Sequence, residues 1–257
     1  MISGAFLPGS SMVHRTDPRI KLALLIVWVV ALILPVSLLS LAGYYLGLVL
    51  LITLALSFRE VLQPLKTIWP ILLLVALLTP PFHHAGRTLF QIGTSVTITL
   101  GGLQEALILI IRFSGITSAF FLFFRTTSID DFILTLRWYG LPYSGALVIT
   151  IAFRYIPSLL QLYHNIEDAH ALRRPVQSGK ATLNPVKKFT HLFPTLVSVM
   201  IHSIKSIPTL SMALESRGFG RSNSRTSYRR LRPLQKVIHQ AVFSVIVLLF
   251  IVLLLFI

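Results

Sequence analysis

The sequence predicts an all-α integral membrane protein with about five transmembrane helices and, before the last of them, a region of long amphipathic helices. Hydrophobic residues make up 54% of the 257 residues and charged residues 12%, and the mean hydropathy is +0.80. Soluble domains carry about a quarter charged residues. In addition, long apolar runs alternate with short basic stretches, which is the pattern of a multi-pass membrane protein.

Five apolar runs approach the length that crosses a hydrocarbon core of about 30 Å. They are residues 20–37, 38–57, 67–80, 103–124 and 237–257. The third run is short and contains Pro70, Pro80 and Pro81, so tilt or local bilayer thinning would have to accommodate it. The first nineteen residues lack the order of a signal peptide, and the first run is therefore expected to remain as a membrane helix.

The formal net charge of +15 is explained by membrane orientation rather than by nucleic-acid binding. If the N-terminus is cytoplasmic, nearly every Lys and Arg between the runs lies inside, whereas Arg87 alone lies outside and Arg112 lies within a span. We therefore expect the N-terminus inside and the C-terminus outside. The loop between residues 81 and 102 alternates Ile, Val and Thr between glycines, which predicts a small external strand pair.

The sequence contains little that would support catalysis. It has no cysteine, no phosphate-cradling P-loop, no HExxH pattern and no nucleophile elbow. His83 and His84 are adjacent but lack a third ligand, so we expect a plain loop there and no metal site. We predict no catalytic residue, and any ATP hydrolysis would belong to a partner.

Residues 126–235 are too polar to span repeatedly and too apolar to be a solvated tail. Ser128 is the expected N-cap of a short helix that has Asp130 and Asp131 in its first turn and ends near Gly140. Two long helices follow, from residue 141 to 174 and from 184 to 219.

Each long helix has polar residues spaced by three or four, which places them on one face. They are Thr150, Arg154, Ser158, Gln161, Asn165 and Asp168 in the first helix, and Lys188, His191, Thr195, Ser198, His202, Lys205 and Thr209 in the second. Internal prolines, among them the candidate hinges Pro157 and Pro208, are expected to kink both helices. We interpret the pair as bent helices that lie partly beneath the membrane.

Both long helices end in the same arrangement of an alanine followed four residues later by an arginine. Ala169 precedes Arg173, and Ala213 precedes Arg217. This spacing puts the small residue one turn below the arginine, so another surface can approach closely while the guanidinium projects beyond the helix end. Gly218 suits a left-handed helix stop. A single copy would be an arginine favoured by the helix macrodipole, but two copies favour a docking function.

These endings, AHALRR and ALESRGF, resemble the paired Ala-Arg-Gly signatures of the transmembrane T component of energy-coupling factor (ECF) transporters, the EcfT and CbiQ type. The N-terminal segment FLPGSSMVHRTDPRIKL is similar to that family as well, as are RTTSIDDFILTLRWYGLP and FRYIPSLLQ, so the resemblance covers nearly the whole chain. One position departs: Arg174 stands where the family has glycine.

The resemblance implies an L-shaped, noncatalytic subunit of a prokaryotic plasma (inner) membrane. Residues 1–125 would form a transmembrane region of four helices, residues 126–235 a cytoplasmic coupling domain, and residues 236–257 a C-terminal transmembrane helix. Two ABC-type ATPase subunits (A and A′), which hold ATP and Mg, would dock at the helix ends, and a substrate-binding S component would pack on the apolar faces. The expected docking residues are Ala169, Arg173, Arg174, Ala213, Arg217 and Gly218.

Vitamins are the expected substrate class, and the alternative is a dedicated cobalt, nickel or biotin system. This chain itself would bind no cofactor and no nucleic acid. A self-sufficient carrier or a membrane enzyme are less favoured, because no internal repeat or acid-base cluster is apparent. Glu105 and Arg112 lie seven residues apart in the fourth span and are either an intramembrane functional pair or, for Arg112, an interhelical anchor.

Overall fold

The computed structural model describes residues 9, 11–35, 37–56, 58–82, 88–92, 96–172 and 185–220. These residues are almost entirely helical, which confirms the predicted fold class. By their internal contacts they divide into two compact units: the first ends at Gly140 and the second begins at Leu141. Each unit is described by itself.

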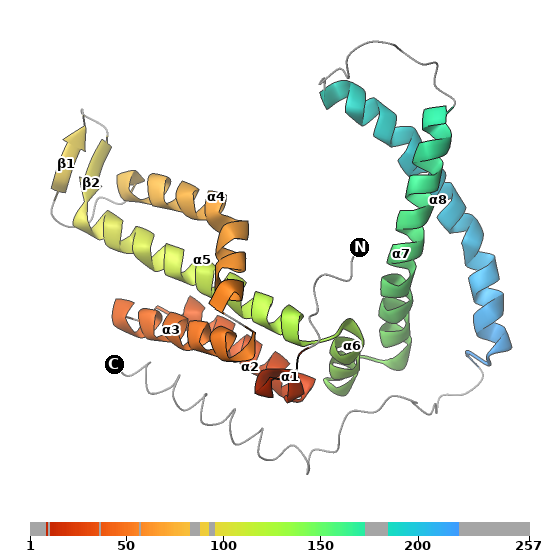
Figure 1. Cartoon of the computed structure of the whole chain (residues 1–257), viewed down its shortest axis with the longest axis horizontal. Coiled ribbons are helices and arrows are strands. Elements are labelled where there is room, and N and C mark those ends of the chain that lie inside the picture. Colours follow the sequence, from red (N-terminus) through yellow and green to blue (C-terminus); the bar gives the residue numbers. More distant parts are fainter. Residues whose placement is uncertain are drawn as a thin grey trace. The chain divides into compact units, whose positions relative to one another are not determined.

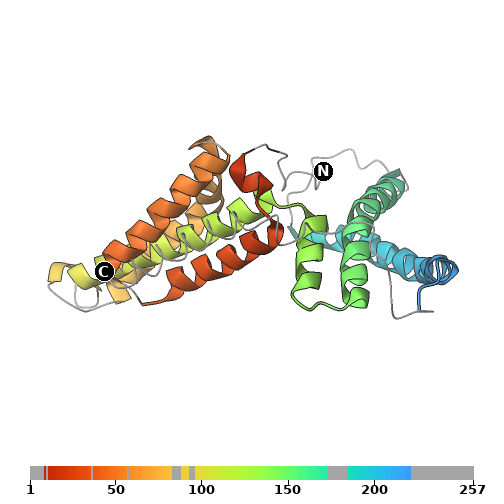
Figure 2. The same ribbon diagram turned by 90° about the horizontal axis from the view of Figure 1, so that it is seen from below.

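The first unit is a helical bundle around one long helix. Helix α5 (Leu100–Thr126) packs against α2 (Pro18–Ile33), α3 (Leu38–Ala55) and α4 (Phe58–Phe82), as Figures 1 and 2 show. The short helices α1 (Met12–Arg15) and α6 (Ile129–Trp138) complete the unit. Its most completely buried apolar residues are Leu32, Leu41, Tyr44, Leu48 and Ile52.

A two-stranded antiparallel sheet joins α4 to α5. Strand β1 (Thr88–Ile92) pairs with β2 (Val96–Thr99), with Thr88 opposite Thr99 and Ile92 opposite Val96. The predicted strand pair is thereby confirmed, while its placement outside the membrane stays a prediction. His83 and His84 lie outside the described residues.

Polar side chains cap the N-terminal ends of helices in this unit. Asp17 accepts a hydrogen bond from the backbone N–H of Arg19 at 3.0 Å at the start of α2. Thr99 and Ser128 cap α5 and α6 in the same way, through the N–H groups of Gly102 and Asp131 at 3.1 Å and 3.2 Å. The predicted cap of the short helix is confirmed, and the helix stops before Gly140, which has a φ of 111°.

Five helices in the described part of the chain are long and apolar enough to cross a membrane; the first three coincide with the predicted runs 38–57, 67–80 and 103–124, and the last two belong to the predicted long amphipathic helices. They are Leu38–Ala55, Glu60–Phe82, Leu100–Thr126, Tyr143–His170 and Phe193–Ser216. Helix α2 has 16 residues, a rise of about 24 Å, which is short for a perpendicular span. The predicted span 237–257 lies outside the described residues.

Helix α4 is longer than its apolar run suggested. The prediction of a short segment at 67–80 was wrong, because the helix runs from Phe58 to Phe82 through four prolines and bends part-way (Figure 1). Proline is tolerated inside membrane helices where other groups satisfy the freed backbone. Within this helix, the hydroxyl of Thr67 donates to the carbonyl oxygen of Gln63 at 3.0 Å.

An ion pair ties α4 to α5. Nη2 of Arg125 lies 3.1 Å from Oε2 of Glu60 and donates to Oε1 of Gln63 at 2.9 Å, and the guanidinium lies over the ring of Phe121. Because Arg125 and Glu60 are both largely buried, this contact holds the last turn of α5 against the first turn of α4.

The second unit consists of α7 (Tyr143–Leu172) and α8 (Pro185–Ser216), which pack against each other and cross (Figure 1). Both helices continue through their internal prolines, and α8 changes direction along its length. The polar residues of α7 from Thr150 to Asp168 are largely exposed, as predicted, whereas Thr195 of α8 is buried, so packing interrupts the predicted polar face there.

We predict that Gly115→Ala lowers the melting temperature of the purified protein. A Cβ atom at Gly115 would lie 3.0 Å from a methyl group of Leu32, which is fully buried and has little room to move. The resulting overpacking costs about 1–3 kcal/mol, which outweighs the helix propensity gained from alanine, about 1 kcal/mol. Thermal unfolding in detergent measures the effect.

The matched control is Gly145→Ala in α7, where the added Cβ would meet its nearest neighbour at 3.4 Å, an ordinary contact. That variant should keep or raise the melting temperature. A melting temperature that rises equally in both variants would show that α2 and α5 do not pack as closely as described.

Candidate docking site at the ends of the long helices

Helix α8 ends in a left-handed stop made by its own backbone. Gly218 has a φ of 73°, its N–H donates to the carbonyl oxygen of Glu215 at 2.8 Å, and the N–H of Phe219 donates to that of Leu214 at 2.9 Å. This pair of bonds satisfies two carbonyl groups that a helix end otherwise leaves open. The prediction that Gly218 terminates the helix is therefore confirmed.

This stop leaves Arg217 at the boundary of the helix with its side chain exposed. Ala213 lies one turn earlier and is also exposed, while Leu214 and Phe219 are half-buried. Because backbone N–H groups already occupy the carbonyls of Leu214 and Glu215, those carbonyls do not require the guanidinium as a cap. A planar group with five donors beside a small residue can receive a carboxylate or a ring of carbonyl groups from another surface.

The end of α7 is described as far as Leu172. Ala169 and Leu172 are exposed, the latter at 88%. Arg173 and Arg174 lie outside the described residues, so the structure does not place the arginine of this second predicted docking end. The pairing of Ala169 with Arg173 stays a prediction.

An exposed apolar row runs along α8 toward the docking end. Phe193, Leu196, Met200, Ile204 and Ile207 follow one another at intervals of three or four residues, and each is more than half exposed. We call these five residues the α8 apolar row. A row of this length on a helix surface needs to be covered, either by lipid or by another protein.

The two candidate hinges lie within continuous helix. Pro157 in α7 and Pro208 in α8 are both exposed, and neither interrupts the helix assignment. Each proline removes one backbone donor, which weakens the helix locally without breaking it. Their role as hinges stays a prediction.

Arg112 contacts the end of another helix in the first unit. Its Nη2 donates to the carbonyl oxygen of Leu34, the C-cap residue of α2, at 3.0 Å. A cation at the C-terminal end of a helix is favoured by the macrodipole and satisfies an open carbonyl. Of the two roles considered for Arg112, this geometry is that of the interhelical anchor. Glu105 lies seven residues earlier in the same helix and is half-buried.

A second cation, Lys21, bonds a carbonyl group at the C-terminal end of α5. The sequence did not predict this contact. Nζ of Lys21 donates to the carbonyl oxygen of Thr126 at 2.8 Å and to that of His14 at 3.3 Å. Nearby, the guanidinium of Arg19 lies 5.0 Å from the centre of the Trp138 ring, so α6 is held against the start of α2. A lysine close to an aspartate at a helix start was visible in the sequence, but its tertiary partners were not.

The described residues contain no group of three or more His, Asp or Glu side chains that could hold a metal ion.

Comparison with known proteins finds one family and several relatives that match most of the chain. The profile of the CbiQ family, described as cobalt transport protein, matches residues 9–228. The energy-coupling factor transporter transmembrane protein EcfT of Bacillus subtilis is 31% identical over 90% of this chain and 89% of its own length. The protein of the same name from Streptococcus equi is 30% identical over 90% and 88%.

We predict that Gly218→Ala opens the end of α8. The left-handed conformation costs an L-residue about 1–2 kcal/mol, so amide exchange at residues 218 and 219 should become at least about fivefold faster. Hydrogen–deuterium exchange on the full-length protein measures this. Ser216→Ala, which removes only a hydroxyl that donates to the carbonyl oxygen of Ala213, should leave both amides as protected as before. Unchanged exchange in Gly218→Ala would contradict the described helix stop.

We also predict that Arg112→Gln lowers the melting temperature whereas Glu105→Gln does not. Arg112 makes a charge-assisted hydrogen bond to the end of α2, and such bonds contribute about 1.5–3 kcal/mol. An anchoring role requires only the arginine. If the two substitutions produce equal losses of transport with no change in melting temperature, the two residues act as an intramembrane pair instead.

Proposed function

The chain belongs to the CbiQ family of cobalt transport proteins, and from this premise we propose that it is the noncatalytic coupling subunit of an energy-coupling factor transporter. Its partners in this proposal are two cytoplasmic ABC-type ATPase subunits and a separate substrate-binding membrane subunit. The ATPases hold ATP and Mg, and this chain binds no cofactor. The protein is a multi-pass membrane protein, and we place its N-terminus and α6–α8 on the cytoplasmic side of a prokaryotic plasma membrane because the basic residues lie there.

The main support for this proposal is the exposed side chain of Arg217 at the end of α8. Arg217 extends from a helix in which the carbonyls of Leu214 and Glu215 are already bonded, beside the exposed Ala213. Such an end suits insertion into a groove of a partner that supplies acceptor groups. We assign the same role to Ala169, Arg173 and Arg174 at the end of α7, so that each ATPase subunit receives one helix end.

The charges in α7 and α8 argue against both helices being ordinary spans, although their length and composition would allow it. Arg154 lies 11 residues after Tyr143, and Lys205 lies 12 residues after Phe193, so both lie near the middle of the candidate spans. A cation at the bilayer centre costs about 2.5–3.5 kcal/mol or more. We therefore propose that the two helices lie largely outside the hydrocarbon core and that the substrate-binding subunit covers the α8 apolar row.

In this proposal the chain acts as a mechanical link. ATP-driven closure of the ATPase pair moves the two arginine-bearing ends and changes the angle at which α7 and α8 cross, with Pro157 and Pro208 as the points that yield. The substrate-binding subunit, held on the apolar faces, then tilts so that its site faces alternately outward and inward.

Uptake of vitamins is the proposed activity of the complex. A dedicated cobalt, nickel or biotin system is the second candidate, and the name of the matching family, cobalt transport protein, favours it. The resemblance of the N-terminal segment to the shared T component supports the vitamin proposal. The identity of the co-purifying substrate-binding subunit distinguishes the two.

We predict that Arg217→Glu prevents the ATPase subunits from co-purifying with the tagged protein. A carboxylate at this position would repel the acceptor groups of the proposed groove. The matched control is Lys205→Glu, which reverses an exposed charge on the same helix, 12 residues before Arg217. It should retain the ATPases. Normal co-purification of the Arg217→Glu protein, and of the Arg173→Ala, Arg217→Ala double variant, would refute the docking proposal.

A further inference from the structure

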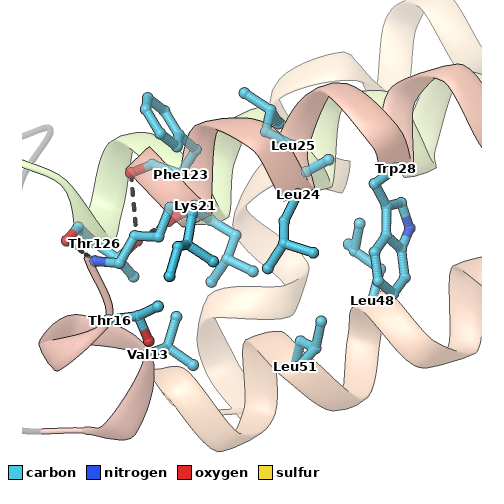
Figure 3. Close-up of a pocket in the computed structure, with 13 residues that line it drawn as sticks. Val13, Thr16, Lys21, Leu24, Leu25, Trp28, Leu48, Leu51, Phe123 and Thr126 are labelled. Atoms are coloured by element: carbon cyan, nitrogen blue, oxygen red, sulfur yellow. Dashed lines mark hydrogen bonds between the residues drawn. The ribbon is translucent and has the colours of Figure 1, made fainter. Parts of the chain in front are cut away.

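The first unit contains an apolar cavity between α2 and α3. Figure 3 shows Leu24 and Trp28 of α2 facing Leu48 and Leu51 of α3 across it, and Ala119 and Phe123 of α5 also line it. Its volume is about 90 Å³, which is room for several methylene groups. None of the proposed docking residues takes part in it, so the cavity is independent of the coupling proposal.

The polar groups that line the cavity gather at one end. Thr16, Lys21 and Thr126 lie together in Figure 3, whereas Trp28 and Leu48 lie at the opposite end. Trp28 follows Lys21 by seven residues, a rise of about 10 Å along α2. The cavity therefore has the polarity of an amphiphile, with a short polar end and a longer apolar part.

The charge at the polar end is already balanced within the protein. The side chain of Lys21 is almost entirely buried, and its ammonium donates to the carbonyl oxygens of Thr126 and His14. The carboxylates of Asp17 and Asp131 attract the same ammonium. An anion is therefore not required for neutrality, and the apolar walls determine what the cavity accepts.

The surroundings of the cavity indicate whether it contains water, is empty or holds a hydrocarbon chain. The apolar part of the cavity does not hold ordered water, because a water molecule needs two to four polar partners. An empty cavity forfeits dispersion contacts along all its walls. Since α3 and α5 are long and apolar enough to cross a membrane, the medium next to the cavity supplies acyl chains.

We propose that this cavity takes up a segment of one acyl chain of a membrane phospholipid, with the headgroup toward the end marked by Lys21. The chain packs between Leu24 and Trp28 on one side and Leu48 and Leu51 on the other. It thereby completes the contact between α2 and α3 that the described residues leave open.

Quenching of Trp28 by brominated lipid tests the proposal. The protein has three tryptophans, and Trp69→Phe with Trp138→Phe leaves Trp28 alone. Trp28 is 5% exposed, so lipid at the outer surface of the bundle has little access to it. In proteoliposomes of phosphatidylcholine with brominated acyl chains, we expect Trp28 emission to fall relative to the unbrominated lipid.

Filling the cavity should abolish this quenching. Ala119→Leu places a larger side chain in the cavity, and Leu51→Phe is a second filling variant should the first fail to fold. Ala76→Leu makes the same substitution on the exposed surface of α4 and should leave the quenching unchanged. A protein with Trp69 as its single tryptophan, 59% exposed, confirms that the brominated chains reach the protein.

Two outcomes would overturn the proposal. If Trp69 is quenched and Trp28 is not, the cavity is closed to lipid, for example by another segment of this chain. If Trp28 is quenched equally in the wild-type background and in both filling variants, the quencher reaches the indole by another route than the cavity.

Discussion

The closure of helix ends is the constraint on which the membrane unit depends. In lipid, each open N–H or C=O group costs several kcal/mol, so the chain itself has to supply partners. At the N-terminal ends these partners are short polar side chains, as with Asp17 at α2 and Ser128 at α6. At the C-terminal ends of α2 and α5 they are cations from another helix: Arg112 of α5 closes α2, and Lys21 of α2 closes α5. The two C-terminal closures are also tertiary contacts, so the same bonds that satisfy the backbone hold α2 and α5 together.

The end of α8 solves the same problem differently, and this difference makes it the better docking candidate. Its carbonyls are bonded by the N–H groups of Gly218 and Phe219, which requires only a glycine in the left-handed region. Arg217 is therefore not needed to satisfy these carbonyls, whereas Lys21 and Arg112 each bond a carbonyl at a helix end. An arginine at a helix end is ordinary on electrostatic grounds, but an exposed arginine beside a helix end that is already closed has its donors available to another molecule.

Local rules predicted the features that are local, and failed where tertiary contacts decide. The cap at Ser128, the stop at Gly218 and the strand pair before α5 each depend on a few adjacent residues, and the structure confirms all three. The extent of α4 could not be predicted, because whether a helix tolerates Pro70 depends on what satisfies the freed backbone around it. Similarly, the partner of Arg112 lies 78 residues away, and helical spacing suggested Glu105 instead. The cavity between α2 and α3 has no sequence signal, since it arises from how two apolar faces meet.

Acidic residues are too few to pair with most of the cations in this chain. With 23 Lys and Arg residues against 8 Asp and Glu, most cations have no carboxylate in the chain to pair with, even if every carboxylate formed an ion pair. Contacts such as Arg125 with Glu60 already use some of the carboxylates. The remaining cations are hydrated by water or bind backbone carbonyls, lipid phosphates or acceptor groups on partners. Lys21 and Arg112 bind backbone carbonyls. Arg154, Lys205 and Arg217 are exposed on helices that have few buried residues, so their side chains are accessible to lipid phosphates or to acceptor groups of another protein.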